Sequence, residues 1–277
     1  MSRIQNILEK AEREGSVQRL HGDPLTPSKG PVPFADAPPP VARYETPVRN
    51  DRAASAVPAI APGRTISGTR LDRLLITATA PDAVTSEQYR SLRTRILYND
   101  TGAALKLLLV TSPGRGDGKS LTAANLALAM AQEPHRRVCL VDANLRNPRV
   151  QRLLGLPEGE GLSDVLVGHA VLDDVLVTME EQQLTVLPAG HSPVSPAELL
   201  GTTAMRRTFD TLRSRFDEVV IDAPAATPLA DVGILTPLVD AVLMVVRAGV
   251  TSKPSIHHAV QALDASKLLG VVLNEAA

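Results

Sequence analysis

From about residue 70 to the end of the chain, short apolar runs alternate with stretches of helical length and pattern. The apolar runs are Leu105–Val110, Val138–Val141, Leu184–Leu187, Val219–Ile221, Ala241–Val246 and Gly270–Leu273. The helix-length stretches between them include Ser120–Ala131, Thr202–Arg215 and Ser255–Leu263. Continuous apolar strands that alternate with helices predict an α/β domain over residues 70–277, with a mostly parallel sheet and helices on both of its faces. Ligands of such sheets bind at the carboxyl ends of the strands.

The first 65 residues do not follow this pattern. In residues 1–20, apolar residues recur at helical spacing from Ile4 to Ala11, which predicts a short amphipathic helix. A helix of this length is marginal in water by itself, so a frayed terminal helix and a docking helix for a partner remain equal alternatives. Residues 21–65 are rich in proline and poor in large apolar residues, which predicts a disordered, extended linker.

Composition and charge narrow the possible functions. The formal net charge is −1 over 277 residues, which argues against a nucleic-acid partner, because such binding needs a basic face. The single cysteine, Cys139, excludes an internal disulfide and is typical of a reducing compartment. No run approaches the roughly 18 to 20 apolar residues that span a bilayer, and the first residues lack the apolar core of a signal peptide. We therefore expect a cytoplasmic protein without a membrane span, which would associate with the inner membrane through a partner.

A glycine-rich segment, TSPGRGDGKS, follows the run at Leu105–Val110 and precedes the helical stretch LTAANLALAM. This order of strand, turn and helix predicts a phosphate-binding loop at Ser112–Ser120, because backbone N–H groups and the positive end of the helix converge on the phosphates. Lys119 can reach the β- and γ-phosphates of a nucleotide, and Ser120 can supply a hydroxyl to Mg²⁺. The expected nucleotide contacts are Gly114, Arg115, Gly116, Asp117, Gly118, Lys119, Ser120 and Leu121. The three glycines are expected to adopt backbone angles that are closed to other residues.

Two aspartates end apolar runs of the expected sheet. Asp142 follows Val138–Val141 and Asp222 follows Val219–Ile221, so both carboxylates are expected at the same sheet edge as the phosphate loop. Mg²⁺ prefers one or two carboxylates together with phosphates and water. Asp222 suits a metal ligand beside Ser120, and Asp142 suits a catalytic base or a second metal contact. The alternative for either aspartate alone is a structural cap on the loop that follows it.

Several segments of the domain match a known family of proteins. They are SEQYRSLRTRI, the phosphate loop, VCLVDANLRNP, LPAGHSPVSPAELL, FDEVVIDAPAATPLADVGIL, VDAVLMVVRAG and LLGVVLN, between about Leu74 and Asn274. They resemble the bacterial tyrosine kinases of capsule and exopolysaccharide biosynthesis, a branch of the P-loop proteins related to MinD and ParA. The N-terminal MSRIQNILEKA resembles a soluble subgroup found beside exosortase-type polysaccharide loci. The resemblance implies a P-loop NTPase fold, ATP and Mg²⁺ as cofactors, Lys119, Asp142 and Asp222 as catalytic residues, and Asn274 as a contact to the base.

Two features separate this branch from its relatives. MinD and ParA proteins carry a signature lysine at the start of the loop, where this chain has Gly114, so a partition-type ATPase is disfavoured. Glu87, Arg90 and Arg93 reproduce the family's E-x-x-R-x-x-R pattern, which falls on roughly one side of a helix. In the family this pattern builds a ring of subunits, so the resemblance implies a homo-oligomer. A solvated helix face with local ion pairs is the alternative.

The chain also departs from the family pattern. The strict loop motif has glycine where this chain has Pro113, and Leu121 replaces the usual threonine, which removes a side-chain contact to the α-phosphate. Asn144 stands where the family commonly has a second aspartate, and an amide cannot take a proton near neutral pH. Arg146 follows two residues later, and it could steady a phosphate or pair with a carboxylate, with an ordinary surface position as the equal alternative.

The tyrosines depart from the pattern as well. The family's accepting tyrosines usually cluster in a C-terminal tail, and no tyrosine follows Tyr98 here, so we expect no tail autophosphorylation in the family manner. Tyr44 falls in the predicted linker. Tyr89 and Tyr98 flank the ring-forming pattern and are expected to pack.

Three functions remain as hypotheses. The leading one is an ATP-dependent protein-tyrosine kinase that regulates exopolysaccharide or capsule production. The second is an ATP-binding assembly module that docks onto a membrane polysaccharide co-polymerase, or chain-length determinant, with little or no phosphotransfer. The third, a partition-type ATPase, is disfavoured by Gly114 and by the near-neutral net charge.

Overall fold

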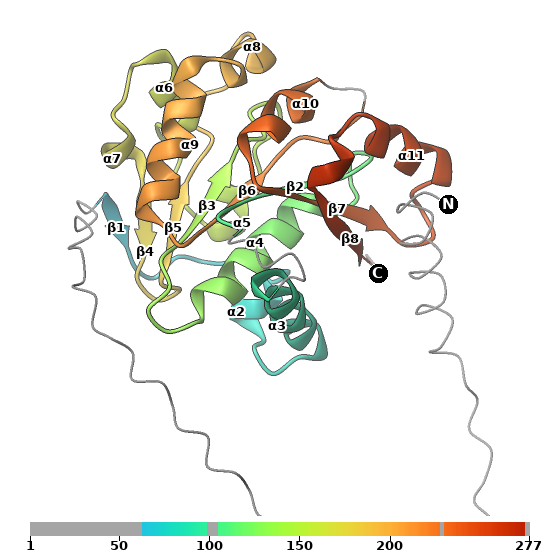
Figure 1. Ribbon diagram of the computed structural model, residues 1–277. Coiled ribbons are helices and arrows are strands. Elements are labelled where there is room, and N and C mark those ends of the chain that lie inside the picture. The colour runs from blue at the N-terminus through green and yellow to red at the C-terminus, as the bar shows by residue number, and fades with distance from the viewer. Residues whose placement is uncertain (1–62, 99–104, 228–229, 275–277) are drawn as a thin grey trace, which may run out of the picture. The chain divides into compact units, whose positions relative to one another are not determined.

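The computed structural model describes residues 63–98, 105–227 and 230–274. The predicted N-terminal helix, Tyr44 and residues 21–62 of the predicted linker lie outside these ranges. The described residues form an 8-stranded sheet in the order β1-β4-β5-β3-β6-β2-β7-β8 (Figure 1). The strands are β1 (Arg64–Ile66), β2 (Leu107–Thr111), β3 (Val138–Asp142), β4 (Val177–Met179), β5 (Leu184–Leu187), β6 (Glu218–Asp222), β7 (Ala241–Arg247) and β8 (Leu268–Asn274).

Neighbouring strands pair in parallel, except that β4 runs antiparallel to β5. The prediction of a mostly parallel sheet is therefore confirmed. The register brings the carboxyl ends of three strands together, because Asp222 of β6 lies opposite Asp142 of β3 on one side and Val110 of β2 on the other. The loop that follows β2 consequently starts beside both aspartates.

Helices cover both faces of this sheet (Figure 1). They are α2 (Ile76–Thr79), α3 (Val84–Leu97), α4 (Lys119–Ala131), α5 (Val150–Leu154), α6 (Leu162–Val167), α7 (Leu172–Val175), α8 (Pro196–Leu200), α9 (Thr203–Arg215), α10 (Asp231–Leu235) and α11 (Lys253–Gln261), with 3-10 turns η1 (Thr236–Leu238) and η2 (Ala265–Lys267). In β2, Leu108 and Val110 join the core around α4, while Leu107 and Leu109 are fully buried and point to the opposite face. Within the described ranges, none of the helices has the length and apolar character needed to cross a membrane.

The helix α4 lies between the sheet and the pair α2 and α3. Its residues from Thr122 to Ala131 are all buried, and its many alanines let it approach its neighbours closely. One polar side chain, Asn125, is fully buried within it. Its Nδ2 donates to the carbonyls of Leu74 and Leu121, each at 3.1 Å, and its Oδ1 accepts from the Thr77 amide at 3.0 Å. The buried amide therefore ties the segment before α2 to the first turn of α4 without an unsatisfied polar atom.

The six apolar runs correspond to β2, β3, β5, β6, β7 and β8, whereas β1 and β4 were not predicted. The predicted end of the linker at residue 65 is wrong, because β1 already begins at Arg64. This short edge strand is held by its pairing with β4 rather than by an apolar pattern of its own. Gly63 marks its start, since a Cβ there would lie 2.1 Å from the Leu176 carbonyl oxygen.

Candidate functional site: a phosphate-binding loop beside two buried aspartates

The glycine-rich segment forms the turn between β2 and α4, as its order in the sequence predicts. Gly116 and Gly118 have φ angles of 87° and 96°, which side chains rarely permit. Gly118 also has no room for a side chain, because a Cβ would lie 2.1 Å from Nδ2 of Asn274. Gly114 does not have a positive φ, so the expectation that it too needs a special backbone angle is wrong.

Asp117 anchors the tip of this loop from within. Its Oδ2 accepts the Gly114 amide at 2.8 Å, and its Oδ1 accepts the Thr251 hydroxyl at 2.8 Å. Its carbonyl accepts Nδ2 of Asn274 at 3.0 Å. With 5% of its surface exposed, Asp117 therefore joins the loop to the segment after β7 and to the end of β8. Asn274 thus contacts the loop itself.

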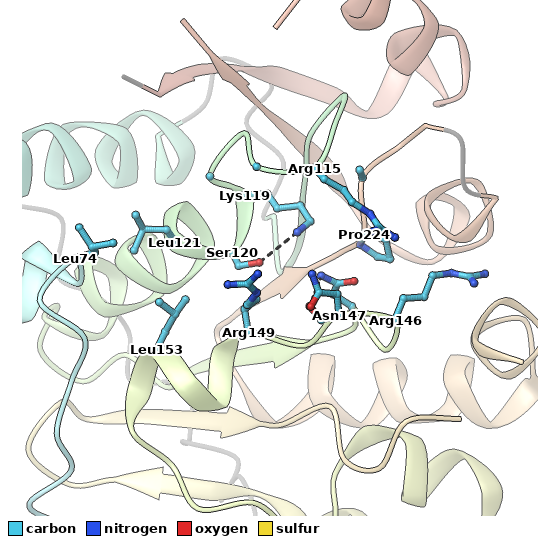
Figure 2. A pocket seen from close by; sticks show the side chains of 14 residues that line it. Leu74, Arg115, Lys119, Ser120, Leu121, Arg146, Asn147, Arg149, Leu153 and Pro224 are labelled. Atoms are coloured by element: carbon cyan, nitrogen blue, oxygen red, sulfur yellow. Dashed lines mark hydrogen bonds between the residues drawn. The ribbon is translucent and has the colours of Figure 1, made fainter. Parts of the chain in front are cut away.

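A cavity of about 270 Å³ opens in front of the loop (Figure 2). It is lined by Leu74, Arg115, Gly116, Gly118, Lys119, Ser120, Leu121, Asn144, Arg146, Asn147, Arg149, Leu153, Pro224 and Ala225. The predicted contacts from Arg115 to Leu121 line it, except for Asp117, and neither Gly114 nor Asn274 does. Nζ of Lys119 lies 3.3 Å from the hydroxyl of Ser120. The cavity therefore combines the lysine, the hydroxyl and the loop backbone that hold a nucleotide phosphate chain.

Asp222 is fully buried at the end of β6, and neither of its carboxylate oxygens has a hydrogen-bond partner among the described residues. Burial raises its pKa to about 6, while the nearby charge of Lys119 and the Ser120 hydroxyl act to lower it. An unpartnered carboxylate in such a position is costly unless a cation joins it. The arrangement of Asp222 and Ser120 fits a Mg²⁺ ion bound together with nucleotide phosphates.

Asp142 is also fully buried, but its oxygens are occupied. Oδ1 accepts the Asn144 amide at 3.1 Å, and Oδ2 accepts the amides of Arg149 and Val150, each at 3.0 Å. Burial and the adjacent Asp222 carboxylate raise its pKa to about 7, although these backbone donors act in the opposite direction. Asp142 therefore holds the start of α5, as the capping alternative describes, and has a pKa near neutrality.

Arg146 forms an ion pair with a carboxylate, which is one of the roles expected for it. Its Nε and Nη2 donate to the two carboxylate oxygens of Asp231 at 2.6 and 3.1 Å, and Asp231 is fully buried at the start of α10. The expectation that Arg146 pairs with a carboxylate is therefore confirmed, although the sequence did not indicate which carboxylate. Asp231 follows 85 residues later, so only the fold brings the two side chains together.

The proposed ring motif lies on α3, away from the cavity. Glu87 and Arg90 pair with each other at 3.0 Å on its exposed side. Arg93 points inward instead, donating to the Ala129 carbonyl at 2.9 Å and pairing with Glu133 at 2.8 Å. The three side chains therefore do not share one free surface.

The two tyrosines near this motif differ. Tyr89 packs against the core, and burial raises the pKa of its hydroxyl. Tyr98 is 80% exposed, so the expectation that it packs is wrong.

The sheet, the loop with its lysine and the aspartates at adjacent strand ends define a P-loop nucleotide-binding protein. No family model matches the chain. It is 36% identical over 209 residues to the tyrosine-protein kinase YwqD of Bacillus subtilis, covering 75% of this chain and 88% of that protein. It is 30% identical over 211 residues to the succinoglycan biosynthesis transport protein ExoP of Rhizobium meliloti, covering 74% of this chain and 26% of ExoP.

Among solved structures, the chimerical protein CapA2B2 matches with a TM-score of 0.70 and 30% identity, covering 78% of this chain and 96% of that one. The chain belongs to the family of bacterial tyrosine-protein kinases. This assignment agrees with the sequence-based preference for the kinase branch over the partition ATPases.

Proposed function

We propose that this protein is an ATP-dependent protein-tyrosine kinase that acts in the production of an exopolysaccharide or capsule. The observation that carries the proposal is the unpartnered, buried Asp222 beside Lys119 and Ser120, in a chain related to YwqD. An isolated buried carboxylate destabilises a fold, so its position next to a phosphate loop favours a role with a bound cation.

The nucleotide would be held by the loop and its lysine. Backbone N–H groups from Gly116 to Leu121 would cradle the phosphates, and Lys119 would bind the β- and γ-phosphates. The Gly114 amide is not available for this, because it donates to Asp117. Ser120 and Asp222 would hold Mg²⁺, with Asp142 as the neighbouring carboxylate. The nucleotide would supply the phosphoryl group, and Mg²⁺ would offset negative charge during its transfer.

Asp142 would serve as the base for the acceptor. In the transfer, the tyrosine oxygen forms a bond to the γ-phosphorus, the bond to the β–γ bridging oxygen breaks, and the hydroxyl proton passes to a carboxylate. A pKa of about 7 suits Asp142 to this task, because a base is most effective when its pKa lies near the working pH. Its three backbone donors would keep the carboxylate in place. Asn144 would orient ligands without taking a proton.

Partners follow from the family and from the surface of α3. ExoP, of which this chain matches only 26%, is a transport protein of polysaccharide biosynthesis. A membrane polysaccharide co-polymerase would be the natural partner of this chain, and would bring it to the inner face of the membrane from the cytoplasm. A ring of identical subunits would use the exposed side of α3 that carries Glu87 and Arg90.

The test is the formation of phosphotyrosine. Purified protein is incubated with Mg-ATP, alone and with the soluble segment of a candidate co-polymerase, and then probed for phosphotyrosine. The proposal expects a signal that depends on time and on Mg²⁺ and that Lys119→Met abolishes. Equal signals from the wild type and from Lys119→Met would overturn it.

A further inference from the structure

The cavity in front of the phosphate loop has two chemically different ends. Figure 2 shows Leu74, Leu121 and Leu153 together at one end, and Arg146 and Pro224 at the other. Lys119 and Ser120 lie between these ends. A nucleotide and a phosphate acceptor bound end to end in this cavity would therefore contact chemically different surfaces.

The leucine end is held firmly in place. Leu74 is 56% exposed, yet its carbonyl is bound by the buried Asn125, which also binds the carbonyl of Leu121. The Asp72 amide donates to the Leu153 carbonyl at 2.8 Å and ties the same segment to α5. These bonds fix three leucines, one from the turn before α2 and one each from α4 and α5, as an apolar wall.

The direction of the nucleotide follows from the start of α4. The backbone N–H at Leu121 lies where a P-loop binds the α-phosphate, whereas the loop lysine reaches the β- and γ-phosphates. In Figure 2 the side chain of Lys119 ends on the side of Ser120 that faces away from Leu121. The γ-phosphate is therefore expected toward the arginine end, and the acceptor must approach from there.

From its middle to the Arg146 end, the cavity is strongly cationic, and Figure 2 shows Arg149 beside Ser120 in the middle. Arg115, Lys119, Arg146 and Arg149 line the cavity, and no aspartate or glutamate is among the described residues that do so. Lys119 serves the phosphates, and Arg146 is paired with Asp231. The guanidinium groups of Arg115 and Arg149 form no ion pair within the described ranges, and both residues are exposed.

We propose that Arg115 and Arg149 select the acceptor, favouring a tyrosine with glutamate or aspartate beside it. The inference rests on the proposed kinase activity and names the substrate class of the same site. Carboxylates that flank the tyrosine would pair with the two free guanidinium groups while its hydroxyl meets the γ-phosphate. Arg115 stands on the tip of the loop and Arg149 on the segment that Asp142 holds, so both positions are rigidly placed.

The alternative is that Arg115 and Arg149 bind the triphosphate of the nucleotide. The following experiment distinguishes binding of the acceptor from binding of the nucleotide. Three peptides carry one tyrosine flanked on both sides by glutamate, glutamine or lysine and are otherwise identical. The values of kcat/KM for each peptide and of KM for ATP are measured for the wild type, Arg115→Gln and Arg149→Gln. Arg206→Gln, an exposed arginine of α9 outside the cavity, is the matched control.

The wild type and Arg206→Gln should prefer the glutamate peptide to the glutamine peptide by about fivefold or more, and added salt should reduce the preference. Arg115→Gln and Arg149→Gln should lower the rate with the glutamate peptide by a larger factor than they change the rate with the glutamine peptide or the KM for ATP. Equal rates for all three peptides would overturn the acceptor preference and leave the kinase activity standing. A raised KM for ATP with an unchanged peptide ratio would assign the arginines to the nucleotide and also overturn it. No phosphotyrosine on any peptide would refute the proposed activity and the preference together.

Discussion

Asp142 and Asp222 are register partners on the adjacent parallel strands β3 and β6, and both carboxylates are fully buried. Asp142 is stabilised by three backbone N–H groups, whereas neither oxygen of Asp222 has a partner among the described residues. Two buried like charges at this spacing repel each other, and a cation beside them removes the repulsion. The free energy of unfolding is therefore expected to depend on whether a cation is bound beside the two aspartates.

Asp222→Asn should stabilise the metal-free protein near neutral pH. The pKa values of both aspartates are raised above the unfolded value, so the folded chain binds protons more tightly than the unfolded chain. The stability that this contributes is present at low pH and is lost as the pH rises through the folded values of about 6 and 7. Thermal melts in chelator should therefore show a higher Tm for the variant at about pH 8 and a smaller difference at about pH 5.

The matched control for this prediction is Asp210→Asn, an exposed acidic position on α9. It should leave the melting temperature nearly unchanged at both pH values. In chelator at about pH 8, a lower melting temperature for Asp222→Asn than for the wild type would contradict this prediction. It would show that the Asp222 carboxylate stabilises the metal-free protein.

Gly118→Ala should destabilise the protein more than a left-handed backbone alone explains. Gly118 combines a φ of 96° with a close approach to Asn274, whereas Gly168 has a φ of 79° and open space around it. Gly168→Ala should therefore cost about 1 kcal/mol in the free energy of unfolding, and Gly118→Ala clearly more. Urea denaturation measures both.

A second substitution separates the two contributions at Gly118. Asn274→Ala removes the side chain that the new Cβ would meet, so the double variant should be more stable than the sum of the single changes predicts. Strict additivity of Gly118→Ala and Asn274→Ala would contradict the close contact.

Arg93→Ala should lower stability, although its motif is expected to build a ring. Arg93 is held inside its own chain by the Ala129 carbonyl and by Glu133, and 15% of its side chain is exposed. Losing these charge-assisted bonds from α3 to α4 and to the segment just after it should cost about 1 to 3 kcal/mol in the free energy of unfolding. Urea denaturation at a concentration where the protein is monomeric gives this value.

Arg90→Ala is the natural control within the same motif, because among the described residues Arg90 pairs with Glu87 alone, near the surface. That pair should contribute at most about 0.5 kcal/mol, while sedimentation should show a loss of the ring. Equal destabilisation by Arg90→Ala and Arg93→Ala would mean that the inward contacts of Arg93 do not contribute to stability.

The sequence predicted the parts of the fold that are buried on two sides. Strands such as β2 and β7 read as continuous apolar runs because helices cover both faces of the sheet. β1 and β4 lie at one edge and have only three residues each, so their pairing partners define them rather than their own pattern.

Some residues of the candidate site could likewise be predicted from the sequence, and others could not. The loop, Lys119, Ser120 and the two aspartates are adjacent to strand ends, and their spacing alone predicted them. The contacts of Asp117 with Thr251 and Asn274 join residues 134 and 157 positions apart, and no local pattern signals such a pair. Arg93 also looked like a surface residue, because only the packing of α3 on α4 shows which carbonyl it reaches.

The most direct test of the central claim is transfer of the labelled γ-phosphoryl group of ATP to tyrosine. The wild type, Lys119→Met, Asp222→Asn and the control Arg206→Gln are compared at saturating Mg²⁺, with phosphotyrosine identified after acid hydrolysis. We expect labelled phosphotyrosine with the wild type and Arg206→Gln, and a loss of about a hundredfold or more with Lys119→Met and Asp222→Asn. Undetectable phosphotyrosine from the wild type, or undiminished labelling by Lys119→Met, would contradict it.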